Sequence, residues 1–271
     1  GQFIGGNVIE EFESNISSLC NSKYCVALNS GTDSLVCGLI ALGVKKGDEV
    51  ITPPNSFVAS TSSIVHIGAK PIFVDVLDNQ NIDPVKIEEA ITDKTKAIMP
   101  VHLTGRIANM TEIIKISRKY NIPIIEDAAQ SIGSKYEGKF SGTFGEIGCF
   151  SAHPLKNLNA CGDAGFLITD NFEIWKKIRK LRNHGFENRN IVNEFGYVSR
   201  MDTLQASILN FRLRKLEKVI NKRRRNAEMY FEALKKLPIL LPFEKRKEFN
   251  SYHTFVIQTD KRDQLKDFLH K

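Results

Sequence analysis

A single lysine, Lys156, lies in a turn-forming segment between two apolar runs. The segment reads FSAHPLKNLNACGDAGF (residues 150–166) and is rich in glycine and asparagine. The flanking runs, Ile147–Ser151 and Gly165–Thr169, have the composition of buried strands. A lysine at this place is either solvated on a loop or held in a pocket. In a pocket, a desolvated amine has a lowered pKa and can form a Schiff base with a carbonyl carbon.

A carboxylate closes another strongly apolar segment. Asp127 ends IPIIED (residues 122–127), where a buried charge is costly unless a cation or a hydrogen-bond donor meets it. A local ion pair or a helix N-cap would satisfy it. Alternatively, Asp127 keeps a pyridine ring nitrogen protonated, as pyridoxal phosphate requires in order to act as an electron sink. Gln130 follows one helical turn later and would reach the same ligand.

The segment NSGTDSL (residues 29–35) places a small-residue turn between a strand and a helix start. Free backbone amides and the helix dipole make such a turn a phosphate site, with Thr32 beside it. Ser30 and Thr32 equally suit an ordinary N-cap. The Walker and GxGxxG patterns are both absent from the sequence, so a P-loop or a dinucleotide site is not supported.

Short apolar runs alternate with amphipathic stretches over most of the chain. This alternation predicts an α/β fold, with a mostly parallel seven-stranded sheet covered on both faces. The predicted strands are residues 25–29, 48–52, 71–75, 97–102, 122–127, 147–151 and 165–169. In such sheets ligands bind beyond the carboxyl ends of the strands, where several polar residues fall. Lys156 follows the strand at 147–151 at this same edge, and Ser151 would add a hydroxyl to a phosphate. The pattern therefore predicts a composite site.

The alternation ends near residues 196–201 and a charged amphipathic pattern follows. We expect one long helix from about residue 202 to 236, and a strand at 254–259. The predicted organisation is a large α/β domain over residues 1–200, a long connecting helix over 201–238, and the start of a smaller C-terminal α+β domain over 239–271. The abrupt ends of the chain suggest a fragment of a longer protein.

The composition limits the cellular location and the classes of partner that we expect. The chain has 271 residues, is 42% hydrophobic and carries a formal net charge of +7, much of it in residues 212–225. That basic run is either a solvated helix face or a polyanion patch, and no aromatic residues are interleaved as in a nucleic-acid module. Five cysteines without zinc spacing suggest buried thiols in a reducing cytosol. We therefore expect a cytoplasmic protein with no metal, nucleic acid or membrane partner.

Seven ordered motifs carry a family resemblance. They are NSGTDSL, DEVITPPNSFVAS, PVHLTGR, IIEDAAQSIGSKYEGKFSGTFG, CFSAHPLKNLNACGDAG, LRNHG and GYVSRMDTLQASIL. In this order they resemble nucleotide-sugar aminotransferases of the DegT/DnrJ type, which are fold-type I enzymes dependent on pyridoxal phosphate. The resemblance covers almost the whole chain. It implies transfer of an amino group, with glutamate as the expected donor, onto a keto carbon of a nucleotide-linked deoxysugar, for surface polysaccharide or glycoside biosynthesis. It also implies that an upstream helical segment and most of the C-terminal small domain are missing here.

The resemblance also assigns roles to individual residues. It implies that Lys156 is the Schiff-base lysine, that Asp127 is the pyridinium partner and that Phe57 stacks on the cofactor ring. The remaining cofactor contacts that it implies are Gln130 to the ring hydroxyl, and Ser151, Thr32 and the amides of Gly31 and Asp33 to the phosphate.

A homodimer with shared active sites is implied as well. The family supplies a polar residue from GYVSR to the partner subunit's phosphate, often an asparagine. Val198 replaces that asparagine here, which leaves Arg200 as the candidate. His153 stands where many members have a bulky aromatic residue, and either contacts substrate or packs in its turn. His102 also falls in a family motif and is a second substrate candidate, with a structural role as the alternative.

Two other functions compete with this one. Sugar dehydratases of the same family have a histidine in place of the Schiff-base lysine, and Lys156 argues against them. A non-catalytic binding or regulatory protein could retain the fold without turnover. The presence of both Lys156 and Asp127 favours the aminotransferase.

Overall fold

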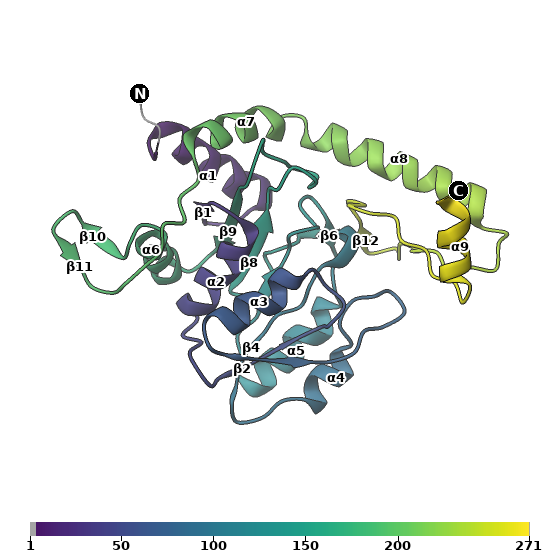
Figure 1. The fold of residues 1–271 in the computed structure, drawn as a ribbon, viewed down its shortest axis with the longest axis horizontal. Coiled ribbons are helices and arrows are strands. Elements are labelled where there is room, and N and C mark those ends of the chain that lie inside the picture. The colour runs from purple at the N-terminus through teal and green to yellow at the C-terminus, as the bar shows by residue number, and fades with distance from the viewer. Residues whose placement is uncertain (1–3, 271) are drawn as a thin grey trace.

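Each of the seven predicted apolar runs overlaps a strand in the computed structural model, which describes residues 4–270 (Figure 1). The strands are β1 Tyr24–Leu28, β2 Glu49–Thr52, β3 Lys70–Phe73, β4 Thr95–Ile98, β5 Ile125–Asp127, β8 Ile147–Ser151 and β9 Gly165–Thr169. Short pairs add β6 Lys135–Tyr136, β7 Lys139–Phe140, β10 Phe186–Asn188, β11 Ile191–Val192 and β12 Glu248–Phe249.

The main strands form two hydrogen-bonded sheets, ordered β1-β9-β8-β5 and β3-β2-β4. Two isolated parallel bridges, Ile98 with Ile124 and Val101 with Asp127, connect them. Strand β2 is parallel to β3 and β4, and β5 is parallel to β8. Strand β9 is antiparallel to both β1 and β8. The reason is that residues 152–164 join β8 directly to β9 without the crossover helix that a parallel neighbour needs.

Helices lie between the strands and cover the sheets (Figure 1). They are α1 Asn7–Cys20, α2 Gly31–Ala41, α3 Val58–His66, α4 Pro84–Glu89, α5 Met110–Tyr120, α6 Phe172–Leu181, α7 Thr203–Leu213, α8 Leu216–Leu234 and α9 Arg262–Leu269, with a short 3₁₀ turn, η1, at Leu103–Gly105. Helix α1 packs against β1 and α7, whereas α2 packs against β8, β9, α3 and α6. The predicted α/β architecture is therefore present, but the seven strands are divided between a four-stranded mixed sheet and a three-stranded parallel sheet.

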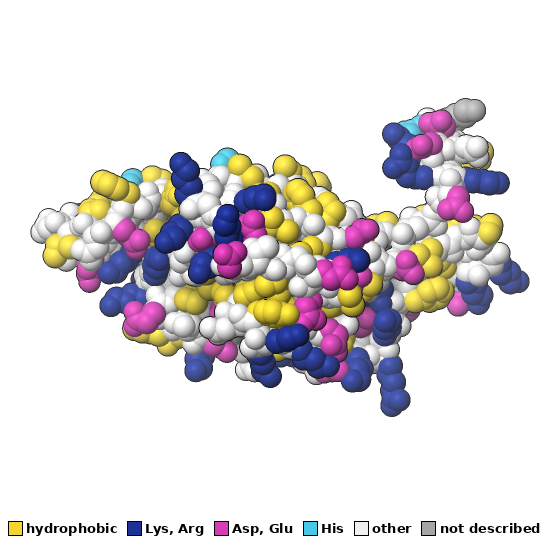
Figure 2. Space-filling model, turned by 90° about the horizontal axis from the view of Figure 1, so that it is seen from below, with side chains coloured by type: hydrophobic (Ala, Val, Ile, Leu, Met, Phe, Trp, Pro, Cys, Tyr) yellow, Lys and Arg dark blue, Asp and Glu magenta, His cyan; other side chains and the backbone are white. Residues whose placement is uncertain are grey.

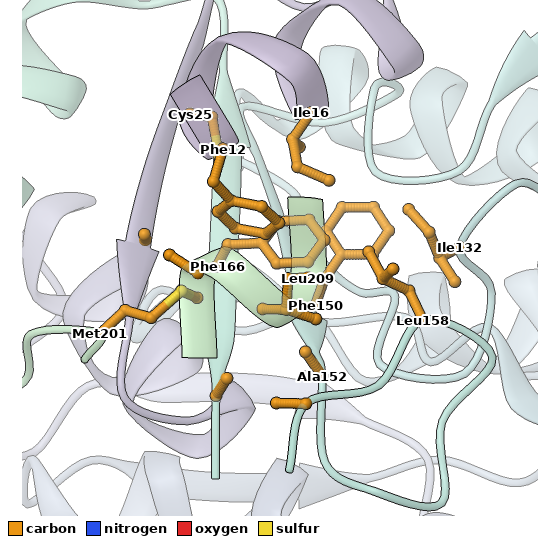
Figure 3. Packing of buried hydrophobic residues seen from close by; sticks show 14 of the residues in the cluster. Phe12, Ile16, Cys25, Ile132, Phe150, Ala152, Leu158, Phe166, Met201 and Leu209 are labelled. Carbon is orange, nitrogen blue, oxygen red and sulfur yellow. The ribbon is translucent and has the colours of Figure 1, made fainter. Parts of the chain in front are cut away.

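Alternate residues of β1 enter two different cores. Cys25 and Ala27 belong to the cluster with α1 and α7, and Val26 and Leu28 belong to the cluster with α2 and α6. Successive side chains of a strand point to opposite faces, so both faces of the sheet are buried. On the α1 side, Phe166 stacks on Phe150 with ring centroids 4.9 Å apart (Figure 3).

The single helix predicted over residues 202–236 is two helices. Helix α7 ends at Leu213, and α8 begins at Leu216 and runs on toward the C-terminal segment (Figure 1). The break follows Arg212, whose guanidinium donates to the backbone oxygens of Asn159 and Ala160 at 2.8 and 3.2 Å. This contact ties the end of α7 to the loop that follows β8.

The strand predicted at residues 254–259 was also wrong. The segment forms one isolated antiparallel bridge, between Leu240 and Gln258. A strand requires a continuous ladder with a neighbour, and the described residues provide none here. Strand β12 pairs instead with β6 of the large α/β unit. The division of the chain at residues 200 and 238 stays a prediction.

Positive and negative side chains are mixed on the face seen in Figure 2, where dark blue and magenta atoms alternate over the body. Helix α8 shows the same mixture in its sequence, LEKVINKRRRNAEMYFEAL, in which acidic residues flank the basic run. This mixture fits the solvated-face interpretation of residues 212–225. Within residues 4–270, no helix combines the length and the apolar character needed to cross a bilayer.

The aromatic cluster on the α1 side gives a test of the core. Phe12 is fully buried and meets Phe166 edge-on, with centroids 5.5 Å apart. Phe12→Ala should lower the free energy of unfolding by about 3–5 kcal/mol, because it removes a large side chain and leaves a cavity. Phe268→Ala is the matched control, since Phe268 is 71% exposed, and should change stability by less than about 0.5 kcal/mol. Urea denaturation measures both, and equal effects would contradict the core assignment.

Candidate active site

A cavity of about 510 Å³ lies beyond the carboxyl ends of β1, β5 and β8. Its lining comes from six separate parts of the chain. Eight of the predicted site residues line it: Gly31, Thr32, Phe57, Asp127, Gln130, Ser151, His153 and Lys156. Asp33, His102 and Arg200 are not part of its lining.

Lys156 projects from a tightly held loop between β8 and β9. Its backbone amide donates to the carbonyl of His153 at 2.8 Å, which closes a turn. Asn157 and Leu158 directly follow and are buried. Burial lowers the pKa of the Lys156 amine, and the negative charge of Asp127 partly opposes this shift. The lysine is thus held in a partly desolvated pocket, the second of the two environments considered from sequence.

Asp127 ends β5 and is 4% exposed. Its two carboxylate oxygens accept hydrogen bonds from neutral donors. Ser60 Oγ donates to Oδ2 at 2.6 Å, and the Ala129 amide donates to Oδ1 at 3.1 Å. A carboxylate oxygen has two lone pairs, so each retains capacity for a further donor from the cavity. This geometry suits an acid that faces a protonated ring nitrogen.

The first turn of α2 also lines the cavity. Ser30 caps the helix, since its Oγ accepts from the Asp33 amide at 3.1 Å. The same cap occupies the Asp33 amide, and the predicted contact of this amide with the phosphate stays a prediction. Gly31 lies so close to Ser151 that a Cβ on it would come within 2.7 Å of the Ser151 Cβ. The start of α2 and the Ser151 hydroxyl thus form one continuous surface.

Three further predicted residues lie around the opening. Gln130 Oε1 accepts from the Thr104 amide at 2.7 Å, which leaves the side-chain NH₂ as a donor. Phe57 precedes α3 and is 69% exposed, so one face of its ring is free to cover a ligand. His153 is exposed, and its Nδ1 accepts from the Leu155 amide at 3.3 Å.

His102 does not contact the cavity, and the prediction that it binds substrate is corrected. Its ring is fully buried, with Nε2 2.7 Å from Glu126 Oε2, and its Nδ1 accepts from the Ala108 amide at 3.2 Å. Both ring nitrogens are therefore occupied. Glu126 and Asp127 are consecutive in β5 and point to opposite sides of the strand. His102 pairs with the carboxylate on the side away from the cavity.

Arg200 lies outside the cavity of its own chain. Its Nη1 donates to Asn183 Oδ1 at 2.9 Å, and its backbone bridges to Leu28 of β1. The side chain is partly buried. A contact with the partner subunit's phosphate stays a prediction.

His253 is a cavity residue that sequence reasoning missed. It lines the cavity, and its Nδ1 is buried without a hydrogen-bond partner among the described residues. Burial lowers the pKa of the ring to about 4, and the positive charges of Lys156 and Arg223 add to the effect. Arg223 holds its backbone by donating to the His253 carbonyl at 2.9 Å. No local spacing in the sequence connects this residue with Lys156, because the chain returns to the cavity from a distant segment.

The donor set fits pyridoxal phosphate. The cavity contains a partly desolvated amine at Lys156, a carboxylate at Asp127 and an anion site at the start of α2. Those groups match the aldehyde, the ring nitrogen and the phosphate of this cofactor. On the α/β sheet described above, they define a fold-type I enzyme dependent on pyridoxal phosphate. The chain belongs to the DegT/DnrJ/EryC1/StrS aminotransferase family, whose model matches residues 1–271.

Curated relatives carry two kinds of name. A UDP-N-acetyl-3-dehydro-alpha-D-glucosamine 3-aminotransferase of Acidithiobacillus ferrooxidans is 41% identical over 269 residues, which are 99% of this chain and 73% of that protein. A pleiotropic regulatory protein of Geobacillus stearothermophilus is 39% identical over 272 residues, again 99% of this chain and 73% of that protein.

Solved structures agree with the fold. DesV of Streptomyces venezuelae, in complex with a ketimine intermediate, has a TM-score of 0.97 and 35% identity, and covers 100% of this chain and 73% of its own. NtdA of Bacillus subtilis, with bound cofactor PMP, has a TM-score of 0.90 and 39% identity, and covers 97% of this chain and 61% of its own.

These findings confirm the family, the fold type, the enzyme class and pyridoxal phosphate as the cofactor. Several of the curated relatives are named as sugar aminotransferases or transaminases. The roles of individual residues, the glutamate donor, the homodimer and the cytoplasmic location stay predictions.

The lowered pKa of His253 gives a pH test on cofactor-free protein. The folded-state pKa is about 4 against an ordinary value of 6.5. Between these values the unfolded chain binds a proton that the folded chain does not, so stability falls as the pH drops from 6.5 to 4. The loss from this group should be about 2 kcal/mol after allowance for its partial exposure.

His253→Asn should remove that part of the pH dependence, because the amide does not titrate. His66→Asn is the control, since His66 is exposed on α3. Urea denaturation at a series of pH values measures the slope. A slope that His253→Asn leaves unchanged would contradict a ring held neutral in the cavity.

Proposed function

We propose that this enzyme transfers an amino group, taken from glutamate, to a keto carbon of a nucleotide-linked deoxysugar. The aminotransferase named for a UDP-linked sugar, 41% identical over nearly the whole chain, supports the substrate class. The observation that carries the proposal is the meeting of Lys156, Asp127 and the start of α2 around one cavity.

Each residue has a definite task in this proposal. The bound cofactor supplies an electron sink for the carbanion that amino transfer requires. Lys156 would hold the cofactor through its aldehyde carbon, and its amine, which burial makes easier to deprotonate, would then carry a proton. Asp127 keeps the ring nitrogen protonated, with Gln130 at the ring hydroxyl. Thr32, Ser151 and the Gly31 amide bind the phosphate.

Two histidines are placed to bind the sugar of the substrate in this proposal. His253 is neutral at physiological pH, since its pKa is about 4, and its Nδ1 has no partner among the described residues. A neutral ring nitrogen binds a sugar hydroxyl without competing for the negative charge of Asp127. His153 stands at the opening, where its Nε2 is available to the substrate.

Lys156 distinguishes the competing functions. A dehydratase of this family has a histidine at its position, whereas this chain has a lysine directed into the cavity. The relative named as a pleiotropic regulatory protein makes a regulatory role the second candidate. A regulator needs to bind the cofactor but not to turn over, so it does not require a partly desolvated amine beside an acid.

The active unit in this proposal is a homodimer. Two large apolar side chains of the cavity lining are exposed, Phe57 at 69% and Leu155 at 74%, and Val198, near Arg200 in the sequence, is 58% exposed. A second copy of the chain would cover them and bring Arg200 to the phosphate of the neighbouring site, where a guanidinium binds with two parallel hydrogen bonds.

Substitution of the lysine tests the function directly. Lys156→Ala should abolish amino transfer and the visible absorption band of the lysine-bound cofactor, because the covalent link and the proton carrier are both lost. Lys176→Ala is the control, since Lys176 is an exposed lysine of α6. The assay is the bleaching of that band by glutamate, followed by its recovery with a panel of nucleotide-linked ketosugars. Normal turnover in Lys156→Ala would rule out the assignment.

Mixed dimers test the shared site. Arg200→Ala should weaken cofactor retention, and Lys156→Ala chains should be inactive alone. A mixture of the two variants should recover up to about a quarter of the wild-type activity, because random pairing makes half of the dimers mixed and each mixed dimer has one intact site. Mass spectrometry verifies that the mixed dimers form. If they form and remain inactive, Arg200 does not act across the interface.

A further inference from the structure

Helix α3 contains a run of hydroxyl residues, and one of them behaves differently from its neighbours. Ser62 and Ser63 donate to the helix backbone, to the carbonyls of Ala59 at 3.4 Å and Ser60 at 3.0 Å. Such bonds are usual for serines inside helices. Ser60 is fully buried, and its hydroxyl leaves the helix to reach Asp127 Oδ2 at 2.6 Å.

The direction of this hydrogen bond is fixed by the chemistry. An ionised carboxylate only accepts, so the single hydroxyl proton of Ser60 goes to Asp127. Ser56 Oγ lies 2.6 Å from Ser60 Oγ. Because Ser60 already donates its hydroxyl proton to Asp127, Ser56 is the donor in that pair and Ser60 Oγ is the acceptor. The two serines therefore form a directed chain, from Ser56 at the edge of the cavity through Ser60 to the acid.

We propose that Ser60 is a positioning residue that holds the Asp127 carboxylate in the orientation that faces the protonated ring nitrogen of the cofactor. The inference rests on the proposed role of Asp127. The Ser60 hydroxyl occupies one lone pair of Oδ2 and leaves the other for a donor in the cavity. Together with the Ala129 amide on Oδ1, it also fixes the carboxylate plane. Ser60 is not part of the cavity lining and would act through Asp127.

Substitutions at Ser60 separate this role from packing. Ser60→Ala should lower the rate constant of the glutamate half-reaction about tenfold, the effect of about 1.4 kcal/mol. Ser60→Thr keeps the hydroxyl and should restore most of the rate. Ser63→Ala is the matched control, since Ser63 is also fully buried on α3 but bonds only to the backbone. It should leave the rate unchanged.

A measurement that does not depend on turnover follows the proton itself. Cofactor-free protein is loaded with pyridoxal phosphate labelled with ¹⁵N in the ring, and the nitrogen chemical shift is recorded. In Ser60→Ala it should move from the wild-type position toward that of neutral pyridine. Ser56→Ala should move it the same way by a smaller amount, and it remains usable if Ser60→Ala does not fold, because Ser56 lies in the loop before α3.

A double-mutant cycle with Asp127→Asn completes the test. If Ser60 acts through Asp127, adding Ser60→Ala to Asp127→Asn should cause little further loss of rate. Additive losses, an unchanged nitrogen shift in the serine variants, or an equal loss in Ser63→Ala would each overturn the inference. Failure of the proposed function is a different result, because wild-type protein would then show no reaction with glutamate while the nitrogen shift could still be compared.

Discussion

Two consecutive buried carboxylates at the end of β5 impose the main constraint on this structure. Glu126 is fully buried and accepts from the amides of Gly142, Phe144 and Gly145 at 2.6–2.7 Å, while His102 supplies a fourth contact. Without such donors, the desolvation of this buried charge would lower the stability of the fold by roughly several kcal/mol. The loop at residues 142–145 and the segment at 102–108 are therefore arranged around Glu126. These contacts also fix the backbone of the adjacent Asp127, whose side chain faces the cavity.

Different residues supply the negative and the positive charge of the cavity. Its carboxylates are the buried Asp127 and the exposed Asp163, and its positive potential comes from the Lys156 amine and the start of α2. A glycine allows these groups to lie close together. A Cβ on Gly165 would come within 2.2 Å of the Ser30 backbone, so the helix start can lie against the sheet only because that atom is missing. The anion site, the amine and the acid thus sit on one rigid platform.

Local patterns in the sequence predicted the platform well. Seven apolar runs gave the strands, and the strand-end rule gave most of the cavity residues, because both depend on short-range periodicity. Three features escaped this reasoning for physical reasons. The side of β5 on which His102 lies depends on the register of a bridge between strands. The break after α7 coincides with a contact from Arg212 to a loop that is distant in the sequence. His253 belongs to a segment with no periodic pattern. The antiparallel β9 follows from the missing crossover helix, which could have been read from the sequence.

The loop that carries Lys156 is fastened by the last third of the chain. Asn157 donates to the Ser251 carbonyl at 3.1 Å, Cys161 exchanges two hydrogen bonds with Gln205, and Arg212 holds Asn159. On the ribosome, the strands on both sides of this loop emerge well before those anchors do. The position of the loop that carries Lys156 therefore depends on residues as far along the chain as Ser251, which lies 94 positions after Asn157.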